Sequence, residues 1–440
     1  MMEQAQLLYG RQLLDRQLQA LAISAAGLQS RPAMTPLPNR QIRCERCGQV
    51  CSQSEVRLPN GNDYCPACIQ LGRVTSEQRL YFLPEPNAFP VRKSVCSWTG
   101  QLTPTQTRVA NLIKTVFQEQ QTHLLWAVTG AGKTEMLFPG LTAALTAGKR
   151  VGIVSPRVDV CLELAPRLQA AFAPVPLALL HGQQTVPYRY TQLVLATTHQ
   201  LLRFYQAFDV LVIDEVDAFP FVDSRELHFA VQQARKPKSA CLYLTATPDA
   251  KLLRQIKQNK LAVSYVPRRF HGFKLPEPQC HHLRMTPNRL PAALKKRLAG
   301  KVAQQQRFLI FVPRIVYLRA LQKQLHQEWP ALTTETVYAA DPDRHEKVAA
   351  FRAGRQQVLL ATTILERGVT FPNIDVVVLF ADDCVFTTSA LVQMAGRAGR
   401  DRQHPDNQVD FYYHFYTTAI RNACRQIQMM NRRAAQETDQ

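Results

Sequence analysis

The chain has 440 residues, 46% of them hydrophobic, which is enough for two or three domains with buried cores. Its 53 basic residues against 33 acidic ones give a net charge of +20, and this excess favours a polyanionic partner, nucleic acid before a membrane surface. No apolar run is long enough to span a bilayer, and the N-terminus lacks the pattern of a signal peptide. We therefore expect a cytoplasmic protein whose 11 cysteines are thiols or metal ligands.

The N-terminal 97 residues are expected to hold a small module between two connecting segments. Residues 1–40 predict an amphipathic helix to about Leu21, followed by the proline-rich connector 31–39. Residues 73–97, which contain three prolines within Leu83–Pro90, are expected to be a second linker.

Residues 41–72 contain two Cys-x-x-Cys pairs. Two such pairs complete a closed tetrahedral site, so a structural zinc module is predicted. Its ligands are Cys44, Cys47, Cys65 and Cys68. Cys51 is interpreted as a spare, small buried thiol. Arginines around the module, among them Arg46, either contact DNA phosphates or offset the thiolate charge.

Residues 98–275 are expected to form the first of two lobes, and a glycine-rich loop is its centre. An apolar run to Val128 precedes the loop and a helix start at Glu135 follows it. Such a loop closes backbone N–H groups around phosphate oxygens. It consists of Thr129, Gly130, Ala131, Gly132, Lys133 and Thr134. Lys133 is expected on the β- and γ-phosphates of ATP and Thr134 on Mg²⁺, although Ala127 replaces the first glycine of the usual pattern.

The stretch Thr103-Pro104-Thr105-Gln106 has two compatible interpretations. One is a helix start in which Thr103 is the N-cap and Gln106 closes a capping box. The other is a glutamine that reads adenine upstream of the phosphate loop. The stretch alone favours the capping box, and a helix is expected to follow through Phe117.

Apolar runs alternate with helical stretches through the first lobe, which predicts a doubly wound parallel α/β sheet. The runs are Leu124–Val128, Arg150–Val154, Leu177–Leu180, Leu193–Ala196, Val210–Ile213 and Cys241–Leu244. Polar signatures follow several of these strands and should converge on one crevice. In the signature Asp214–Asp217, Asp214 is expected to hold Mg²⁺ and Glu215 to activate the attacking water.

A second α/β unit is expected over residues 276–430, with a polar tail at 431–440. Its strands are Arg307–Val312, Thr336–Tyr338, Val358–Ala361, Val376–Phe380 and Val409–Tyr416. Arg397 and Arg400 lie near a helix start among glycines, where guanidinium groups can neutralise a transferring phosphoryl group. Two basic stretches, 249–275 and 289–307, are either a polyanion-binding surface or solvated helix faces.

Taken in order, these motifs resemble those of superfamily 2 helicases and translocases over roughly residues 98–416. The resemblance implies two RecA-like lobes with ATP between them. It implies adenine contact for Gln106, phosphate and Mg²⁺ binding for Lys133, Thr134 and Asp214, and general-base action for Glu215. It also implies completion of the ATP site by Gln393, Arg397 and Arg400, coupling by Thr245 and Thr247, and contact with the nucleic-acid backbone by Arg157, Thr198, His199 and Thr363.

Within that superfamily the phosphate loop is similar to that of PriA helicases, but other features resemble the ComFA family of late-competence ATPases. These are the cysteine module ahead of the first lobe, Asp214-Glu-Val-Asp217, the stretch Thr363–Phe371 and the N-terminal Leu8–Leu13. The resemblance implies work in the cytoplasm beside a membrane DNA channel, with partners among the DNA-uptake proteins.

The sequence therefore predicts a DNA-dependent ATPase that translocates on single-stranded DNA, with ATP, Mg²⁺ and Zn²⁺ as cofactors. Three alternatives remain open. The first is a PriA-like helicase that unwinds duplex DNA. The second is an ATP-gated binding or assembly protein whose hydrolysis times partner release, and the third is an RNA helicase.

Overall fold

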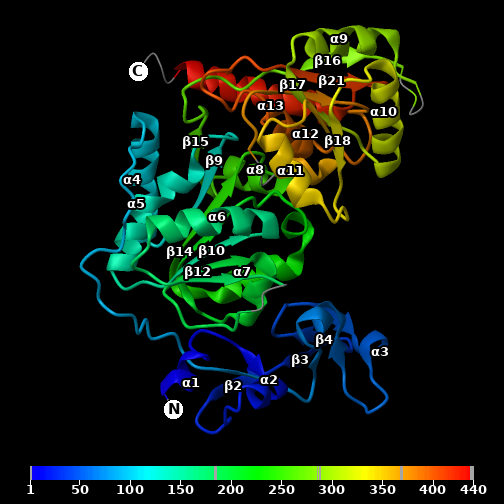
Figure 1. Cartoon of the computed structure of the whole chain (residues 1–440). Coiled ribbons are helices and arrows are strands. Elements are labelled where there is room, and N and C mark those ends of the chain that lie inside the picture. The colour runs from blue at the N-terminus through cyan, green and yellow to red at the C-terminus, as the bar shows by residue number, and fades with distance from the viewer. Residues whose placement is uncertain (1, 183–185, 285, 287–288, 367–369, 437–440) are drawn as a thin grey trace. The chain divides into compact units, whose positions relative to one another are not determined.

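The computed structural model describes residues 2–182, 186–284, 286, 289–366 and 370–436 (Figure 1). The density of contacts divides the chain into two compact units. The first comprises residues 1–125, 134–245 and 249–264. The second comprises residues 126–133, 246–248 and 265–440, so the phosphate loop groups with the C-terminal part of the chain.

The first unit begins with a module of small antiparallel sheets, drawn in blue in Figure 1. One sheet has the order β1-β8-β2, a second the order β3-β4-β5, and β6 pairs with β7. The strands are β1 (Leu13–Leu14), β2 (Gln29–Pro32), β3 (Met34–Leu37), β4 (Gln41–Cys44), β5 (Val50–Ser52), β6 (Tyr64–Cys65), β7 (Val74–Thr75) and β8 (Arg79–Phe82). The helices are α1 (Met2–Gln6), α2 (Asp15–Ala20), α3 (Gln53–Val56) and the 3-10 helix η1 (Pro66–Leu71).

Three predictions for this region are wrong. The single helix to Leu21 is two short helices on either side of β1. The proline-rich connector is strand, with Pro32 in β2 and Pro36 in β3. Both strands are at sheet edges, where a residue without an N–H does not interrupt the ladder. The expected linker 73–97 begins with β7 and β8.

The large sheet of the first lobe has seven strands in the order β11-β12-β10-β13-β14-β9-β15. Pairing from β11 to β14 is parallel. The strands are β9 (Thr122–Ala127), β10 (Val151–Ser155), β11 (Leu177–Leu180), β12 (Leu193–Thr197), β13 (Phe208–Ile213), β14 (Arg235–Thr245) and β15 (Ala262–Val266). The helices are α4 (Pro104–Gln118), α5 (Lys133–Thr146), α6 (Val158–Ala171), α7 (Arg225–Ala234), α8 (Ala250–Lys257) and the 3-10 helices η2 (Thr198–Arg203) and η3 (Phe221–Asp223). All six predicted strands are present, and β15 was not predicted.

The second lobe has a six-stranded parallel sheet in the order β16-β21-β20-β17-β19-β18. The strands are β16 (Gln279–His282), β17 (Arg307–Phe311), β18 (Thr334–Val337), β19 (Val358–Ala361), β20 (Ile374–Val378) and β21 (Val409–Tyr413). The helices are α9 (Ala292–Ala303), α10 (Ile315–Glu328), α11 (Arg344–Arg352), α12 (Thr388–Ala395), α13 (Thr418–Gln436) and the 3-10 helix η4 (Thr363–Leu365). The five predicted strands are confirmed, and β16 is additional.

The expected polar tail is wrong as far as residue 436, because α13 continues to Gln436. Asn431 is buried, and its amide accepts a hydrogen bond from Leu275 N at 2.9 Å and donates one to Leu275 O at 3.0 Å. These bonds pair the α13 side chain with backbone groups of the segment that enters the second lobe. Residues 437–440 lie outside the described residues.

The N-terminal module and the first lobe share one hydrophobic core. The same cluster of buried residues contains Leu14, Ile42 and the four predicted zinc ligands from the module, together with Phe204 and Phe208 from the lobe. A buried ion pair adds to this core, since Arg150 at the start of β10 pairs with Glu85, and neither side chain is exposed. The supposed linker is therefore part of the folded first unit.

The predicted fold class is confirmed as two parallel α/β lobes preceded by a four-cysteine module. Among the described helices, none is both long enough and apolar enough to cross a membrane.

Candidate ATP site and four-cysteine centre

The phosphate loop has the predicted strand, loop and helix. Strand β9 ends at Ala127 and α5 begins at Lys133. Gly130 and Gly132 have φ values of +79° and +74°, which glycine adopts without steric penalty. Ala127, in place of the usual first glycine, is a fully buried strand residue, so no left-handed conformation is required there. The loop thus leads into a helix N-terminus suited to phosphate.

The acidic signature follows β13, which only β14 separates from β9 in the sheet order. The Asp214 carboxylate accepts a hydrogen bond from Glu215 N at 2.9 Å. Glu215 has a φ of +54°, an uncommon conformation for a residue with a side chain and one that gathers at functional sites. The backbone therefore turns sharply between the two carboxylates that the sequence assigns to Mg²⁺ and to the general base.

The signature ends in a buried contact with the Thr245–Thr247 motif. Thr245 Oγ1 donates to Asp217 Oδ1 at 2.6 Å, and both side chains are buried. Two residues later, Thr247 Oγ1 lies 2.9 Å from Ser389 Oγ in the first turn of α12. Thr245 belongs to the first unit and Thr247 to the second, so the chain passes from one unit to the other within this motif.

The arginine motif of the second lobe follows the C-terminal end of α12, so the prediction that Arg397 and Arg400 lie near a helix start is wrong. Gln393 and Arg397 are 4% and 3% exposed. Arg397 Nε donates to Glu366 O at 3.0 Å, and Arg400 Nη1 donates to Thr370 Oγ1 at 2.9 Å. Both guanidinium groups thus contact the stretch that follows β19. Residues 367–369 of that predicted ComFA-like stretch lie outside the described residues.

Arg269 is a site residue that the sequence analysis missed. Its guanidinium donates to Ala398 O at 2.6 Å and Gly396 O at 3.3 Å, and it also bonds Gly399 O. It is 2% exposed, and this burial lowers the pKa of Arg269 to about 9. The expectation that 249–275 is a polyanion surface is therefore wrong for Arg269. Nothing in the sequence distinguishes this arginine from its basic neighbours.

The second basic stretch contains ion pairs within the second lobe. Lys301 pairs with Asp375 and lies 3.7 Å from Asp410, and Arg297 lies 3.3 Å from the same Asp410 carboxylate. His281 in β16 also contacts Asp410, at 2.8 Å. For Lys301 the polyanion interpretation is wrong, because this buried cation already neutralises buried carboxylates of the sheet.

The capping interpretation of Gln106 is confirmed. Thr103 Oγ1 accepts from Gln106 N at 3.3 Å, and Gln106 Oε1 accepts from Thr103 N at 2.9 Å. The reciprocal bonds fix both the start of α4 and the position of the glutamine amide.

The four predicted DNA-contact residues differ in exposure. His199 is exposed in the first turn of η2, and Arg157 and Thr363 are half-buried at the starts of α6 and η4. Thr198 is fully buried. In this conformation, therefore, the Thr198 hydroxyl does not reach the surface.

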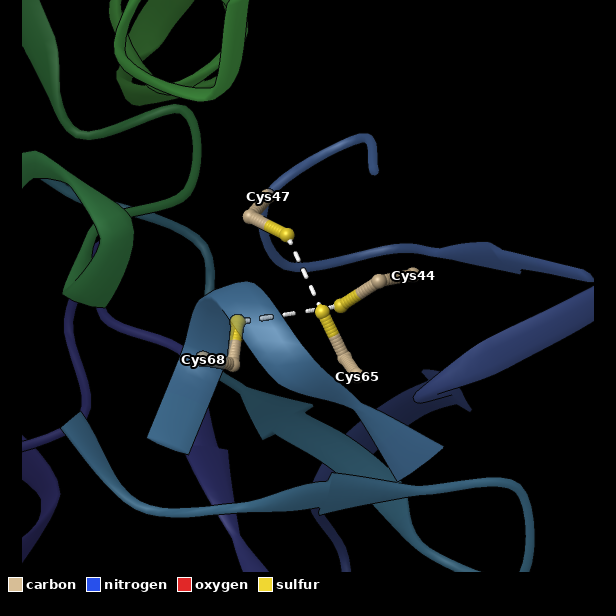
Figure 2. Close-up of side chains that lie close together, drawn as sticks. All are labelled: Cys44, Cys47, Cys65 and Cys68. Carbon is tan, nitrogen blue, oxygen red and sulfur yellow. Dashed lines mark hydrogen bonds between the residues drawn. The ribbon is translucent and has the colours of Figure 1, made fainter. Parts of the chain in front are cut away.

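The four-cysteine centre brings the predicted ligands together (Figure 2). Cys44 and Cys68 have Sγ atoms 3.8 Å apart, and Cys47 and Cys65 have Sγ atoms 3.5 Å apart. All four Sγ atoms lie within 4.8 Å of one another and the residues are buried. Tetrahedral zinc with bonds of about 2.3 Å has S–S edges of about 3.8 Å, so the donor set fits this metal. Cys51 is not a member of this group, and it is half-buried, so the expectation that it is a buried thiol is wrong.

The side chain of Arg46 contacts Cys68 of the four-cysteine centre. Its Nε lies 3.3 Å from Cys68 Sγ, and its Nη2 donates to Cys68 O at 3.0 Å. Hydrogen bonds from the other thiols and the Arg46 charge lower the pKa of Cys68. Arg46 is 3% exposed, so of its two interpretations the structure favours compensation of thiolate charge.

Family models match three consecutive parts of the chain. Residues 1–82 match the N-terminal domain of competence protein ComFA. Residues 103–256 match the DEAD/DEAH box helicase family, and residues 289–402 match the helicase conserved C-terminal domain.

Solved structures share the fold at low sequence identity. Saccharomyces cerevisiae Dbp5 bound to RNA and ADP BeF3 has a TM-score of 0.51 at 15% identity, covering 75% of this chain and 91% of that one. The Mycobacterium smegmatis helicase Lhr bound to ssDNA and AMP-PNP has a TM-score of 0.53 at 17% identity, covering 75% and 48%. These likenesses show that the two lobes are RecA-like.

Two relatives match nearly the whole chain. Competence protein ComFA of Bacillus subtilis is 41% identical over 407 residues, covering 90% of this chain and 87% of the relative. Competence protein ComFA of Streptococcus pneumoniae is 41% identical over 399 residues, covering 90% and 91%. The chain therefore belongs to the ComFA family of competence proteins and is a helicase-like ATPase with two RecA-like lobes.

Proposed function

We propose that this chain is an ATP-driven motor that translocates on single-stranded DNA during uptake of transforming DNA. Membership of the ComFA family supports the competence role, and the helicase domains support ATP use. The net charge of +20 supports a polyanionic partner. Under this proposal the protein works at the inner face of a membrane DNA channel, together with other uptake proteins.

In the proposed ATP site, backbone N–H groups of residues 129–134 and the N-terminus of α5 hold the phosphates, with Lys133 as counter-charge. Thr134 and Asp214 would hold Mg²⁺, which when bound offsets phosphate charge. Glu215 accepts the proton of the attacking water. Gln106 orients the adenine from the start of α4.

On the second lobe, Gln393, Arg397 and Arg400 are proposed to stabilise charge that develops on the transferred phosphoryl group. The contacts of Arg397 and Arg400 with the stretch after β19 support this role, because a guanidinium held by neighbours loses little freedom when it acts. Arg269 is proposed to position this motif, since it bonds the carbonyls of Gly396, Ala398 and Gly399.

The observation that supports a motor best is the Thr245–Thr247 segment. Its first threonine bonds the acidic signature and its last contacts the helix that carries Gln393. Only two peptide units separate Thr245, which bonds Asp217, from Thr247, which contacts Ser389. A change at one contact would therefore be transmitted to the other. Coupling of hydrolysis to movement requires such a connection.

Arg157, His199 and Thr363 are proposed to contact the DNA backbone. Their side chains are exposed or half-buried at the starts of α6, η2 and η4. Thr198 is buried, so under this proposal it would act indirectly and not by touching the DNA. The four cysteines are proposed to hold one structural zinc ion, which stabilises the module and the core that it shares with the first lobe.

Translocation is tested by displacement of streptavidin from biotin-ended single-stranded DNA in the presence of ATP. We expect displacement from one end only, and no displacement would contradict the proposal. A forked duplex, assayed in parallel, tests the alternative of a PriA-like helicase, which would unwind it. ATP hydrolysis stimulated by a protein partner, and by neither DNA nor RNA, would favour the assembly-factor alternative.

A further inference from the structure

Two exposed aromatic rings stand directly after strand β21 of the second lobe. Phe415 is 76% exposed and Tyr416 is 51% exposed. Single exposed aromatic residues are common on protein surfaces. Here two consecutive aromatic residues are exposed, between the end of β21 and the start of α13 at Thr418.

The backbone that carries these rings is held in place by Asp382. Its Oδ1 accepts from His414 N and its Oδ2 from Phe415 N, each at 3.2 Å. The Tyr416 ring packs against Tyr413, with ring centroids 5.4 Å apart. The Phe415 ring is thus exposed on a backbone that Asp382 holds in place, so little backbone entropy is lost when a ligand stacks on the ring.

Cations follow these rings in the chain, and another lies at the same edge of the sheet. Arg421 and Arg425 are exposed and one helical turn apart at the beginning of α13. Strand β17 runs parallel to β20, and β20 to β21, so their carboxyl ends share one edge of the sheet. Arg314, after β17, is exposed at that edge.

The acidic groups at this edge already have partners. The Asp382 carboxylate accepts two backbone N–H groups. Asp383 lies 3.6 Å from Arg314 and accepts from Val385 N at 3.1 Å. The edge therefore combines rings and cations with carboxylates that are occupied, which is complementary to a chain of bases and phosphates.

We propose that Phe415 and Tyr416 form a base-stacking contact for single-stranded DNA, with Arg421 and Arg425 on the adjoining phosphates. Stacking on an aromatic side chain accepts any base, as a motor that moves along arbitrary sequence requires. This proposal rests on the proposed function, and it adds contacts with the DNA bases to the proposed contacts with the DNA backbone.

The test is equilibrium binding of a fluorescent 20-nucleotide oligothymidine and of an abasic strand of equal length to the full chain. Phe415→Ala should weaken binding of oligothymidine roughly 10-fold and leave abasic binding unchanged. Phe415→Trp should restore it. Arg421→Ala with Arg425→Ala should weaken binding of both strands and lower the salt dependence.

Phe273→Ala, which removes an exposed ring from another segment of the second unit, is the matched control and should bind like the wild type. If the wild type binds no single-stranded DNA, the proposed function itself fails. If the wild type binds oligothymidine and Phe415→Ala binds it equally well, only the stacking contact is wrong. Equal weakening of oligothymidine and abasic binding in Phe415→Ala would also overturn it.

Discussion

Thr245 donates a 2.6 Å hydrogen bond to the carboxylate of Asp217, and this bond joins the end of the acidic signature to the segment that leads into the second unit. Both side chains are buried. A short bond from a hydroxyl to a buried carboxylate is directional and stronger than a neutral one. It is the physical basis for treating Thr245 as a coupling residue.

Thr245→Val keeps the shape of this side chain and removes its hydroxyl. We expect ATP hydrolysis without DNA to change less than about 3-fold, while the translocation rate falls at least about 10-fold, because losing a bond of about 1–3 kcal/mol weakens the coupling. Streptavidin displacement and ATP turnover on the same preparation measure this. Thr142→Val, which removes a hydroxyl bonded to Phe138 O within α5, is the control. Equal loss of both activities would contradict a coupling role.

Lys133→Ala and Glu215→Gln separate nucleotide binding from hydrolysis. Lys133→Ala should bind ATP weakly, because the loop loses its counter-charge for the phosphates. Glu215→Gln should bind ATP normally and turn over about 10²–10⁴-fold more slowly, because the general base is lost. Fluorescent-nucleotide binding and steady-state turnover provide the two readings. Lys114→Ala, which alters an exposed lysine of α4, should resemble the wild type. Wild-type turnover in Glu215→Gln would remove it from the catalytic assignment.

Most of the two sheets could be predicted because their strands are apolar runs bounded by polar signatures. Every predicted strand is present. The missed strands have weaker patterns, since β16 is Gln-Cys-His-His and β15 is only partly buried. Strands β2 and β3 were missed because prolines at positions 32 and 36 indicate a connector, and only the place of these strands at sheet edges makes the prolines compatible with a sheet.

In the candidate site, too, some residues could be predicted from the sequence and others could not. The phosphate loop, the acidic pair and the cysteines have fixed local spacings that carry their chemistry, whereas Arg269 becomes important through bonds to residues about 130 positions away. The burial of Thr198 and the ion pairs of Arg297 and Lys301 likewise depend on tertiary contacts. Neither composition nor spacing contains that information.

Zinc content tests the cysteine centre. Purified protein should contain about one zinc ion per chain. The double change Cys44→Ser and Cys65→Ser should remove it and lower the melting temperature, because these residues belong to the core shared with the first lobe. Cys51→Ser should retain the metal. Stoichiometric zinc in the double variant, measured by mass spectrometry of the metal, would contradict the ligand assignment.

The buried Arg150–Glu85 pair predicts that segment 73–97 stabilises the first lobe. Glu85→Ala leaves the Arg150 guanidinium in an unexposed site without its carboxylate, which should lower the free energy of unfolding by about 3–5 kcal/mol. Glu328→Ala removes the partner of Lys295 at a pair whose side chains are 36% and 38% exposed. It should change stability by less than about 1 kcal/mol. Urea denaturation measures both, and equal effects would contradict the structural role of this segment.

The central claim is that DNA drives the ATPase. It is tested by measuring ATP hydrolysis without nucleic acid, with single-stranded DNA, with duplex DNA and with RNA, at two salt concentrations. We expect single-stranded DNA to stimulate hydrolysis most, and the stimulation to decrease at the higher salt concentration because phosphate contacts release counterions. Hydrolysis that no nucleic acid stimulates would contradict the motor and favour a switch timed by a protein partner.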